Sequence, residues 1–400
     1  MTTIQKKVTS LRLVWRFFNE KLMFPFCVNT GRVLLAKNTR KWNISDFFIK
    51  KLCQRLTVFA PMFTKKYIIV GQGLAGTLLA WELLQNGCDV LIYDEGHAEA
   101  ASSVAAGLIN PITGRRMVKS EMIDILMPVA KQTYLDLEKI LGIKLWYSRH
   151  LLWTLSTIKE ENDWALRSSA EGIRDYIEQN PAIDNIQHFF KKDLNFGEIK
   201  NAAQVDLQTL IAAFRRFLKE KNILIEEKYV LQNTDNQIVI YCEGEKARHN
   251  PLWCYLPFVA AKGEALQLKF DENFTEKIIK NNVSVIPLSD GTYWVGSNYE
   301  WNPKDAEPNL AVRENFLQEL NQFLVADYQV VAHRAAIRPT TKDRRPMLGF
   351  HPENPNLAIF NGLGTKGTSL APYWAKHFVQ VLLEKEKLSE VVDIERFSPS

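Results

Sequence analysis

The segment that most constrains the fold is residues 65–96, KKYIIVGQGLAGTLLAWELLQNGCDVLIYDEG, in which two apolar runs flank a glycine-rich turn. The runs, 67–70 and 90–93, are short and rich in β-branched residues, so both are predicted to be buried strands. Apolar residues between them recur at helical spacing, which predicts a helix over 73–86 that ends at Gly87. A strand, a helix and a strand in this order predict a parallel α/β sheet.

The turn after the first strand carries Gly71, Gly73 and Gly76 at the spacing G-x-G-x-x-G. These glycines permit a tight turn, a close approach of backbone to a pyrophosphate, and close packing of the helix on the sheet. Asp94 follows the second strand, near the distance of roughly 20 residues at which a ribose-binding carboxylate is expected. Glu95 beside it has the simpler interpretation of a solvated loop acid. The segment therefore predicts a dinucleotide site in which Asp94 binds the ribose.

The net charge of +5 is unevenly distributed along the 400 residues. Residues 1–61 hold twelve Lys and Arg against two acids, a net charge of +10, so residues 62–400 carry −5. A mildly acidic main part argues against a nonspecific nucleic-acid binder. No uninterrupted apolar stretch approaches the roughly 20 residues that cross a bilayer, so no membrane span is predicted.

The five cysteines contain no C-x-x-C pair, and the seven histidines contain no pair at ligand spacing. An odd number of unpaired cysteines is typical of buried or incidental thiols in a reducing compartment, which predicts a cytoplasmic protein. Without a recognisable ligand set, no metal site is predicted.

Residues 1–61 are basic, poor in acids and without a regular period. They could be an organellar transit peptide or an amphipathic membrane-surface segment. We favour a third interpretation, a basic N-terminal extension that is disordered or not part of the native chain, with Met62 as the working start.

The next part of the chain mixes a small-residue loop with helices and a strand. Residues 101–120, ASSVAAGLINPITGRRMVKS, would let backbone pass close to a flat ring. The basic residues of this loop could meet an anion or be solvated; they are Arg115, Arg116 and Lys119. A helix is predicted over 121–141, a strand within 145–160, and a polar helix over 162–180.

Beyond residue 200 the sequence first predicts further elements of the parallel sheet and then the strands of an antiparallel one. Asp206 is predicted to cap a helix that runs to Lys221, and 238–241 is a further buried strand. Three alternating segments follow, among them VSVIPLSDGTYWVGSNYEW, in which Asp290-Gly291 is a hairpin signal. They predict a separate antiparallel sheet.

A second glycine-rich loop lies near the C-terminus. The strand 357–360 enters the loop 361–367, NGLGTKG, and a helix is predicted to start near Ala371-Pro372. Backbone N–H groups of such a loop also face a ligand. Two loops of this kind, far apart in sequence, suit a long ligand with a pyrophosphate and a flat reactive ring, which favours FAD over NAD.

Several segments together resemble the D-amino-acid oxidase superfamily of FAD-dependent amine oxidoreductases, which includes glycine oxidase and sarcosine oxidase. They are the fingerprint with Asp94, SSVAAGLINP, AAQVDL, IVIYCEG, AAKGE, DGTYWVGSNYE, and the block from Arg338-Pro339 to GLGTKGTSLAP. The likeness spans residues 64–383. The C-terminal motifs look most like the oxidase domain of the bifunctional tRNA methylaminomethyl-thiouridine biosynthesis enzyme.

The resemblance implies a fold that is α/β, or α+β overall. It consists of a discontinuous Rossmann-like FAD-binding domain with an inserted antiparallel β-rich substrate domain. The predicted FAD-binding parts are 62–145, 196–250 and 332–400, and the substrate-binding parts are 146–195 and 251–331.

The resemblance also implies hydride transfer from the carbon beside an amine to flavin N5, giving an imine that water hydrolyses. Arg338 would bind a substrate carboxylate, unless it forms a structural ion pair with an acid such as Asp343. Lys366 would stabilise reduced flavin or be a solvated loop lysine. No cysteine follows Cys254, so FAD is predicted to be noncovalent. The predicted cofactor-binding residues are Gly71, Gly73, Leu74, Ala75, Gly76, Asp94, Glu95, Ser102, Ser103, Ala106, Gly107, Val205, Gly244, Gly362, Gly364, Thr365, Lys366, Gly367 and Thr368.

Three functions remain open from the sequence. The first is oxidation of a small amino acid or secondary amine, which the acidic main part favours. The second is a flavoenzyme of tRNA wobble-uridine modification, favoured by the basic clusters of the 101–120 loop and of Lys342, Arg344 and Arg345, although tRNA is not the preferred partner. The third is a noncatalytic FAD-binding subunit.

Overall fold

The computed structural model describes residues 26–29, 32–35, 66–96, 100–114, 116–232, 236–272 and 274–397. Within residues 1–63, a unit of its own, it describes two strands that pair antiparallel, β1 (Phe26–Asn29) and β2 (Arg32–Leu35). The predictions made for 1–61 otherwise lie outside the described residues. All that follows concerns the unit 64–400.

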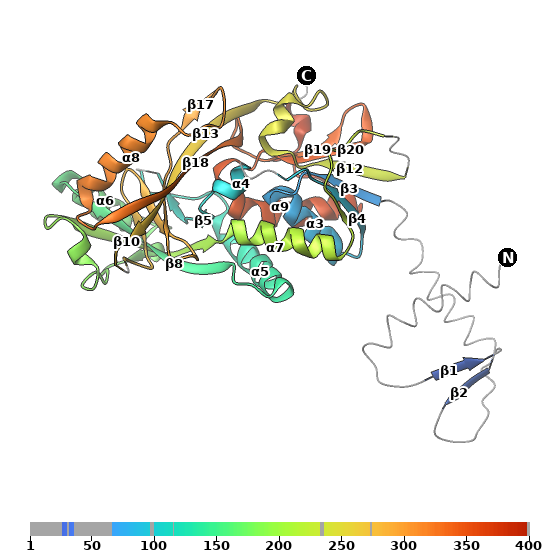
Figure 1. The fold of residues 1–400 in the computed structure, drawn as a ribbon, viewed down its shortest axis with the longest axis horizontal. Coiled ribbons are helices and arrows are strands. Elements are labelled where there is room, and N and C mark those ends of the chain that lie inside the picture. Colours follow the sequence, from blue (N-terminus) through green and yellow to red (C-terminus); the bar gives the residue numbers. More distant parts are fainter. Residues whose placement is uncertain are drawn as a thin grey trace. The chain divides into compact units, whose positions relative to one another are not determined.

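Six strands of the described chain form a sheet with β3 at its centre (Figure 1). β3, β4, β11, β12 and β20 are parallel, and β19 is antiparallel to β20. The first strand, helix and second strand confirm the prediction to within a residue or two, since α3 is Leu74–Gln85. The strand order is β11 (Leu224–Ile225), β4 (Asp89–Tyr93), β3 (Lys66–Val70), β12 (Gln237–Tyr241), β20 (Asn354–Asn361) and β19 (Met347–His351).

Apolar side chains cover both faces of this sheet, as the continuous apolar runs of its parallel strands require. On one face α3 packs with α5 (Ile123–Leu141), α7 (Leu207–Glu220) and α9 (Gly367–Leu382) around a core that contains Leu78, Tyr134, Phe214 and Phe378. The opposite face is covered by Trp253 and its apolar neighbours. The predicted cap of α7 is confirmed, because the Asp206 side chain accepts from the Thr209 N–H.

Ten strands of the described chain form a second, mostly antiparallel sheet. The predicted hairpin is confirmed, with Gly291 at φ 79° in its turn. α8 (Leu310–Phe323) packs against this sheet. The strands are β5 (Leu108–Ile109), β8 (Trp146–Leu155), β9 (Ile177–Glu178), β10 (Asn195–Val205), β13 (Phe258–Phe270), β14 (Ile278–Lys280), β15 (Ser284–Pro287), β16 (Tyr293–Gly296), β17 (Glu300–Trp301) and β18 (Tyr328–Thr341).

Three elements, the strands β10 and β18 and one helix, differ from the sequence-based prediction. β10 and β18 fall largely within the segments assigned to FAD binding, yet β10 pairs with β8 and β18 with β13, so both belong to the ten-stranded sheet. The polar helix predicted over 162–180 is wrong, because α6 is Ile158–Ser168. It begins early because the Thr157 hydroxyl accepts from the Glu160 N–H and caps the helix.

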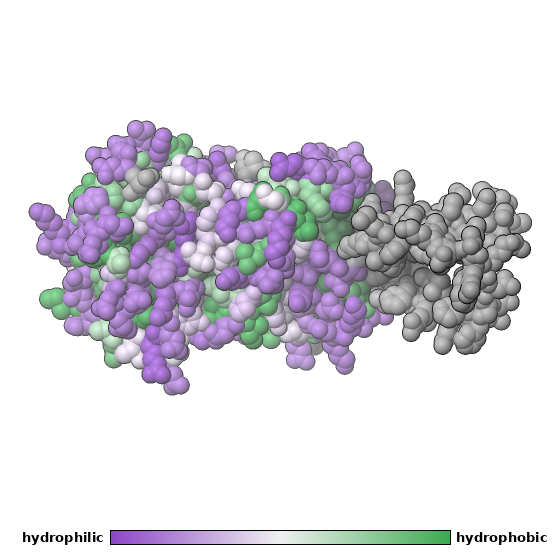
Figure 2. Space-filling view, turned by 90° about the horizontal axis from the view of Figure 1, so that it is seen from below, coloured by the Kyte–Doolittle hydropathy of each residue, from purple (hydrophilic) through white to green (hydrophobic). Residues whose placement is uncertain are grey.

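Figure 2 shows hydrophilic residues over most of the face that it displays, with smaller apolar areas between them. In the part of the chain that the structure describes, no helix combines the length and the apolar character needed to cross a membrane.

Candidate active site

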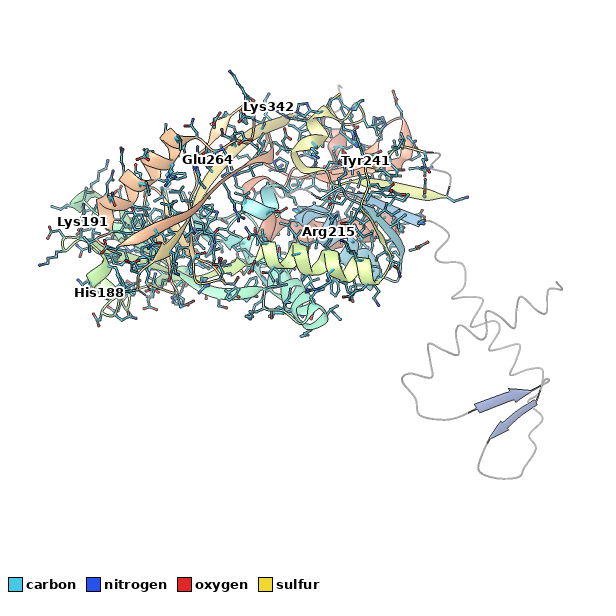
Figure 3. All side chains as sticks on the ribbon, viewed as in Figure 1. His188, Lys191, Arg215, Tyr241, Glu264 and Lys342 are labelled. Atoms are coloured by element: carbon cyan, nitrogen blue, oxygen red, sulfur yellow. The ribbon has the colours of Figure 1, made fainter. Side chains whose placement is uncertain are left out.

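A cavity of about 1370 Å³ is lined by residues of both sheets. Of the labelled residues in Figure 3, Arg215 and Tyr241 belong to its nucleotide-binding side and Glu264 to the ten-stranded sheet. The structure brings most of the predicted site residues together here: Gly71, Gly73, Leu74, Ala75, Asp94, Glu95, Ser102, Ser103, Ala106, Gly107, Gly244, Arg338, Gly364, Thr365, Gly367 and Thr368. Gly76, Val205, Gly362 and Lys366 do not line it.

Glycine is required at the three positions of the first turn for different structural reasons. Gly71 has φ +102°, and a Cβ there would lie 2.6 Å from the Cys242 carbonyl oxygen. A Cβ on Gly76 would lie 1.9 Å from the Gly71 carbonyl oxygen, so the protein itself requires both glycines. Among the described atoms beyond its chain neighbours, a Cβ on Gly73 would meet only the Ser102 hydroxyl, at 3.3 Å. Gly73 therefore leaves space for a ligand at the N-terminus of α3, where free N–H groups and the helix dipole favour an anion.

The predicted ribose acid lies at the end of β4. The Asp94 side chain is 9% exposed and accepts hydrogen bonds from the backbone N–H groups of Gln72 and Gly96, both at 2.8 Å. Glu95 is half-exposed, and its carboxylate lies 4.0 Å from the Lys246 ammonium. The buried Asp94 is thus the better-ordered of the two acids.

The 101–120 segment passes along the cavity through Gly107, whose conformation requires a glycine. Gly107 has φ +70°, and a Cβ there would lie 1.9 Å from the Val205 carbonyl oxygen. The Val205 N–H donates to the Gly107 carbonyl at 2.9 Å. Val205 therefore holds this segment by its backbone and does not itself line the cavity. Lys119 pairs with Asp124 at 2.6 Å, and Arg115 lies outside the described residues.

The second glycine loop leads into α9 earlier than predicted. The helix starts at Gly367 and includes Pro372. Proline cannot donate to the carbonyl four residues before it, and the buried Tyr134 hydroxyl donates to that carbonyl, of Thr368, at 2.9 Å. This bond explains how the helix tolerates the proline.

Lys366 is exposed and does not line the cavity. The chain here is already helical, so Gly364, Thr365, Gly367 and Thr368 share one face and Lys366 lies on the other. The geometry thus gives no support to a role for Lys366 beside the ring. Gly362 does not line the cavity; a Cβ on it would lie 2.8 Å from a methyl group of Thr341.

Arg338 on β18 is a partly buried guanidinium in the cavity wall. Its Nη2 donates to the Ser297 hydroxyl at 2.7 Å, and Nη1 donates to the carbonyls of Asn298 at 3.3 Å and Lys262 at 3.4 Å. The guanidinium carbon lies 4.7 Å from the centre of the Tyr299 ring. Burial lowers the pKa of Arg338, and the nearby tyrosine opposes this effect; arginine stays charged in either case.

None of these acceptors is a carboxylate, and no acid among the described residues pairs with Arg338. The alternative ion pair with Asp343 is wrong, because Asp343 pairs with Arg396 at 2.9 Å. An arginine has five N–H donors, and three have protein acceptors among the described residues. The remaining two are the number that a bidentate carboxylate uses.

The comparison that decides the family covers most of the chain. Residues 66–381 match the family described as FAD dependent oxidoreductase. The chain belongs to this family. The glycine turn, the α3 N-terminus and the second glycine loop of this oxidoreductase fit FAD, because each presents backbone to one continuous cavity.

The matches to related proteins and to solved structures cover nearly the whole length of each of those proteins. The glycine oxidase of Pseudomonas aeruginosa is 23% identical over 365 residues, which cover 84% of this chain and 99% of the relative. The glycine oxidase structure from Geobacillus kaustophilus has a TM-score of 0.68 and 21% identity, covering 83% of this chain and 97% of that one. The iminodiacetate oxidase structure from Chelativorans sp. BNC1 has a TM-score of 0.67 and 21% identity, covering 84% and 99%.

Sequence reasoning missed the residues that hold Arg338 in this oxidoreductase. Ser297, Asn298 and Tyr299 belong to the segment GSNYE, which the sequence analysis assigns to a strand and to the family resemblance without giving these residues a role. A signal was present, since small polar residues directly after Gly296 interrupt the alternation of the strand.

Replacing Gly263 by alanine should disable Arg338 without unfolding the protein. A Cβ at this position would lie 1.7 Å from Nη2 of Arg338, the end of a flexible side chain that can move away. The displaced guanidinium should lose a charged hydrogen bond, and kcat/KM for a carboxylate substrate should fall about tenfold. The melting temperature and flavin content should stay near wild type, and a large loss of either would contradict this explanation.

Proposed function

We propose that this oxidoreductase oxidises the C–N bond of a small amino acid or secondary amine that carries a carboxylate. The observation that carries the proposal is Arg338, a charged group in the cavity wall with no acidic partner among the described residues. Leaving a charge partly desolvated and unpaired is costly, so an anionic substrate group is the natural partner. The glycine oxidases and the iminodiacetate oxidase similar to this chain support an amino-acid substrate.

In the proposed reaction two electrons and a proton leave the substrate carbon as a hydride, and the nitrogen lone pair forms the C=N bond. Water then hydrolyses the imine to a carbonyl compound and an amine or ammonia. FAD, when bound, supplies the hydride acceptor. Arg338 would fix the carboxylate through its fork, while Ser297 and Asn298 hold the guanidinium and Tyr299 covers it.

For FAD, we assign the pyrophosphate to the N-terminus of α3 at Gly73 and the ribose to Asp94. The flat ring would lie against the 105–107 segment and the loop around Gly364. Noncovalent attachment is supported by the absence of cysteine after Cys254 in the sequence, and release of all flavin on acid precipitation would test it. We also propose a cytoplasmic location, supported by the free thiols of Cys88, Cys242 and Cys254.

The test is anaerobic reduction of bound flavin by a panel of compounds. Glycine, sarcosine, iminodiacetate and larger amino acids form one arm, simple N-methyl amines a second, and hypomodified tRNA a third. Bleaching by an amino acid supports the proposal. Bleaching by tRNA alone would favour the wobble-uridine alternative, for which the exposed Lys342, Arg344 and Arg345 are the supporting feature. A yellow protein that no arm reduces would favour the noncatalytic FAD-binding subunit.

A further inference from the structure

The predicted ribose acid has little hydrogen-bonding capacity left. Oδ1 of Asp94 accepts from the Gly96 N–H at 2.8 Å and from Nη1 of Arg215 at 2.6 Å, while Oδ2 accepts, among the described residues, only from the Gln72 N–H at 2.8 Å. A carboxylate oxygen has two lone pairs. Oδ1 is therefore filled, and Oδ2 keeps one position for a ligand hydroxyl.

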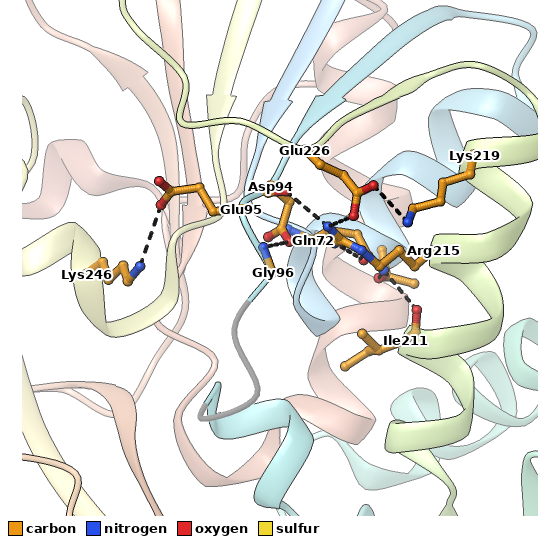
Figure 4. Close-up of polar contacts among 10 residues, drawn as sticks. Gln72, Asp94, Glu95, Gly96, Ile211, Arg215, Lys219, Glu226 and Lys246 are labelled. Carbon is orange, nitrogen blue, oxygen red and sulfur yellow. Dashed lines mark hydrogen bonds and ion pairs between the residues drawn. The ribbon is translucent and has the colours of Figure 1, made fainter.

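Arg215 comes from α7, 121 residues beyond Asp94 in the sequence, and joins three segments around this acid (Figure 4). Nη1 also donates to the Gln72 side chain at 3.1 Å, inside the glycine turn. Nη2 donates to the Asp94 carbonyl at 3.1 Å and to the Glu226 carboxylate at 2.9 Å, just beyond β11. All four N–H groups of the two terminal nitrogens are thus used to hold Asp94 and its surroundings.

The charges around Asp94 are also balanced by basic side chains. Asp94 and Glu226 are balanced by Arg215 and by Lys219, whose ammonium lies 2.7 Å from Glu226. Burial alone would lower the pKa of Arg215, but the hydrogen bonds that it donates to Glu226 and Asp94 outweigh this effect and raise the pKa. Without this guanidinium, a nearly buried carboxylate would stand uncompensated beside the turn that receives the anionic pyrophosphate, and repulsion is strong where water is excluded.

We propose that Arg215 is a positioning residue for the adenosine end of FAD. It fixes the Asp94 carboxylate so that Oδ2 accepts the ribose 2′-hydroxyl, and it neutralises that carboxylate next to the glycine turn. The inference rests on FAD binding and on the assignment of the ribose to Asp94, and it does not depend on which amine is oxidised.

The experiment compares two ligands, FAD and its analogue built on 2′-deoxyadenosine. Their Kd values for full-length apoprotein are measured by flavin fluorescence. Wild type should bind FAD about tenfold more tightly than the analogue, the effect of one hydrogen bond to a charged acceptor. Arg215→Ala should weaken FAD binding about tenfold and bring the ratio of the two Kd values close to one. Arg216→Ala, an exposed neighbour on α7, should leave both quantities unchanged.

Two further variants complete the experiment, one to test the coupling of Arg215 with Asp94 and one to replace Arg215→Ala if it does not fold. In an Asp94→Asn background, Arg215→Ala should add only a small further loss, because the two side chains act as a pair. If Arg215→Ala fails to fold, Arg215→Lys serves instead, since an ammonium cannot reproduce the four hydrogen bonds and should also abolish the preference.

Two results would overturn the proposal. A wild type that binds both ligands equally would remove Asp94 from the ribose. A variant that binds FAD weakly but keeps the preference, with a lower melting temperature of the apoprotein, would show that Arg215 only stabilises the fold. No amine is present in these measurements, so neither result bears on the proposed oxidation.

Discussion

Replacing Gly73 by valine should give a folded protein that purifies without the yellow colour of flavin. Gly73 has φ −82°, which valine adopts without strain, and its Cβ would meet only the Ser102 hydroxyl among described atoms. The added side chain would instead enter the cavity at the N-terminus of α3. Losing one or two backbone hydrogen bonds to a charged pyrophosphate costs about 2–6 kcal/mol, so FAD should bind roughly thirtyfold to twenty-thousandfold more weakly.

Gly76→Ala is the matched control for this prediction. Its Cβ would lie 1.9 Å from the Gly71 backbone, where nothing flexible can yield, so this variant should lose folded protein as well as flavin. Flavin per protein, from the absorbance of denatured samples, and the circular dichroism of each apoprotein separate the two effects. Full flavin occupancy in Gly73→Val, or unfolding as severe as in Gly76→Ala, would show that the pyrophosphate is misplaced.

Local sequence signals were sufficient to predict the first strand, the helix after it and the second strand. The glycines, the helical spacing and Gly87 all act within 32 residues, from 65 to 96, so each choice could be interpreted without knowing the rest of the fold. The wrong prediction for α6 came from a local signal that was present and was not used. Thr157 and Glu160 form the capping pattern S/T-x-x-E, which indicates a helix start that the apolar periodicity alone did not reveal.

Pairing over long distances could not be predicted in this way. The position of β18 depends on β13, and Arg338 takes its acceptors from residues about 40 and 76 positions away. Arg215 lies in an ordinary amphipathic helix pattern, and nothing around it in sequence indicates that it reaches Asp94. Lys366 was predicted from a glycine loop, whereas the geometry of a helical turn decides which of its residues face the cavity.

Replacing Arg338 by lysine should remove the preference that we propose for substrates that carry a carboxylate. Lysine keeps the charge but cannot make two parallel hydrogen bonds. Losing such a contact in a desolvated site costs about 2–5 kcal/mol, which is roughly thirtyfold to a few thousandfold in kcat/KM because each 1.4 kcal/mol is a factor of ten. The Ser297 and Asn298 acceptors would also be left with a single ammonium in place of the fork.

The comparison that tests this uses sarcosine and dimethylamine, which differ only in the carboxylate. Arg338→Lys should slow flavin reduction by sarcosine at least about thirtyfold and leave the rate with dimethylamine nearly unchanged. Arg334→Lys, the same substitution at an exposed residue of β18 that does not line the cavity, is the control and should alter neither. Because Arg338 has no acidic partner among the described residues, flavin content and melting temperature should change little. Equal loss on both substrates, or a loss that follows flavin content, would mean that Arg338 supports the fold and that the substrate is recognised elsewhere.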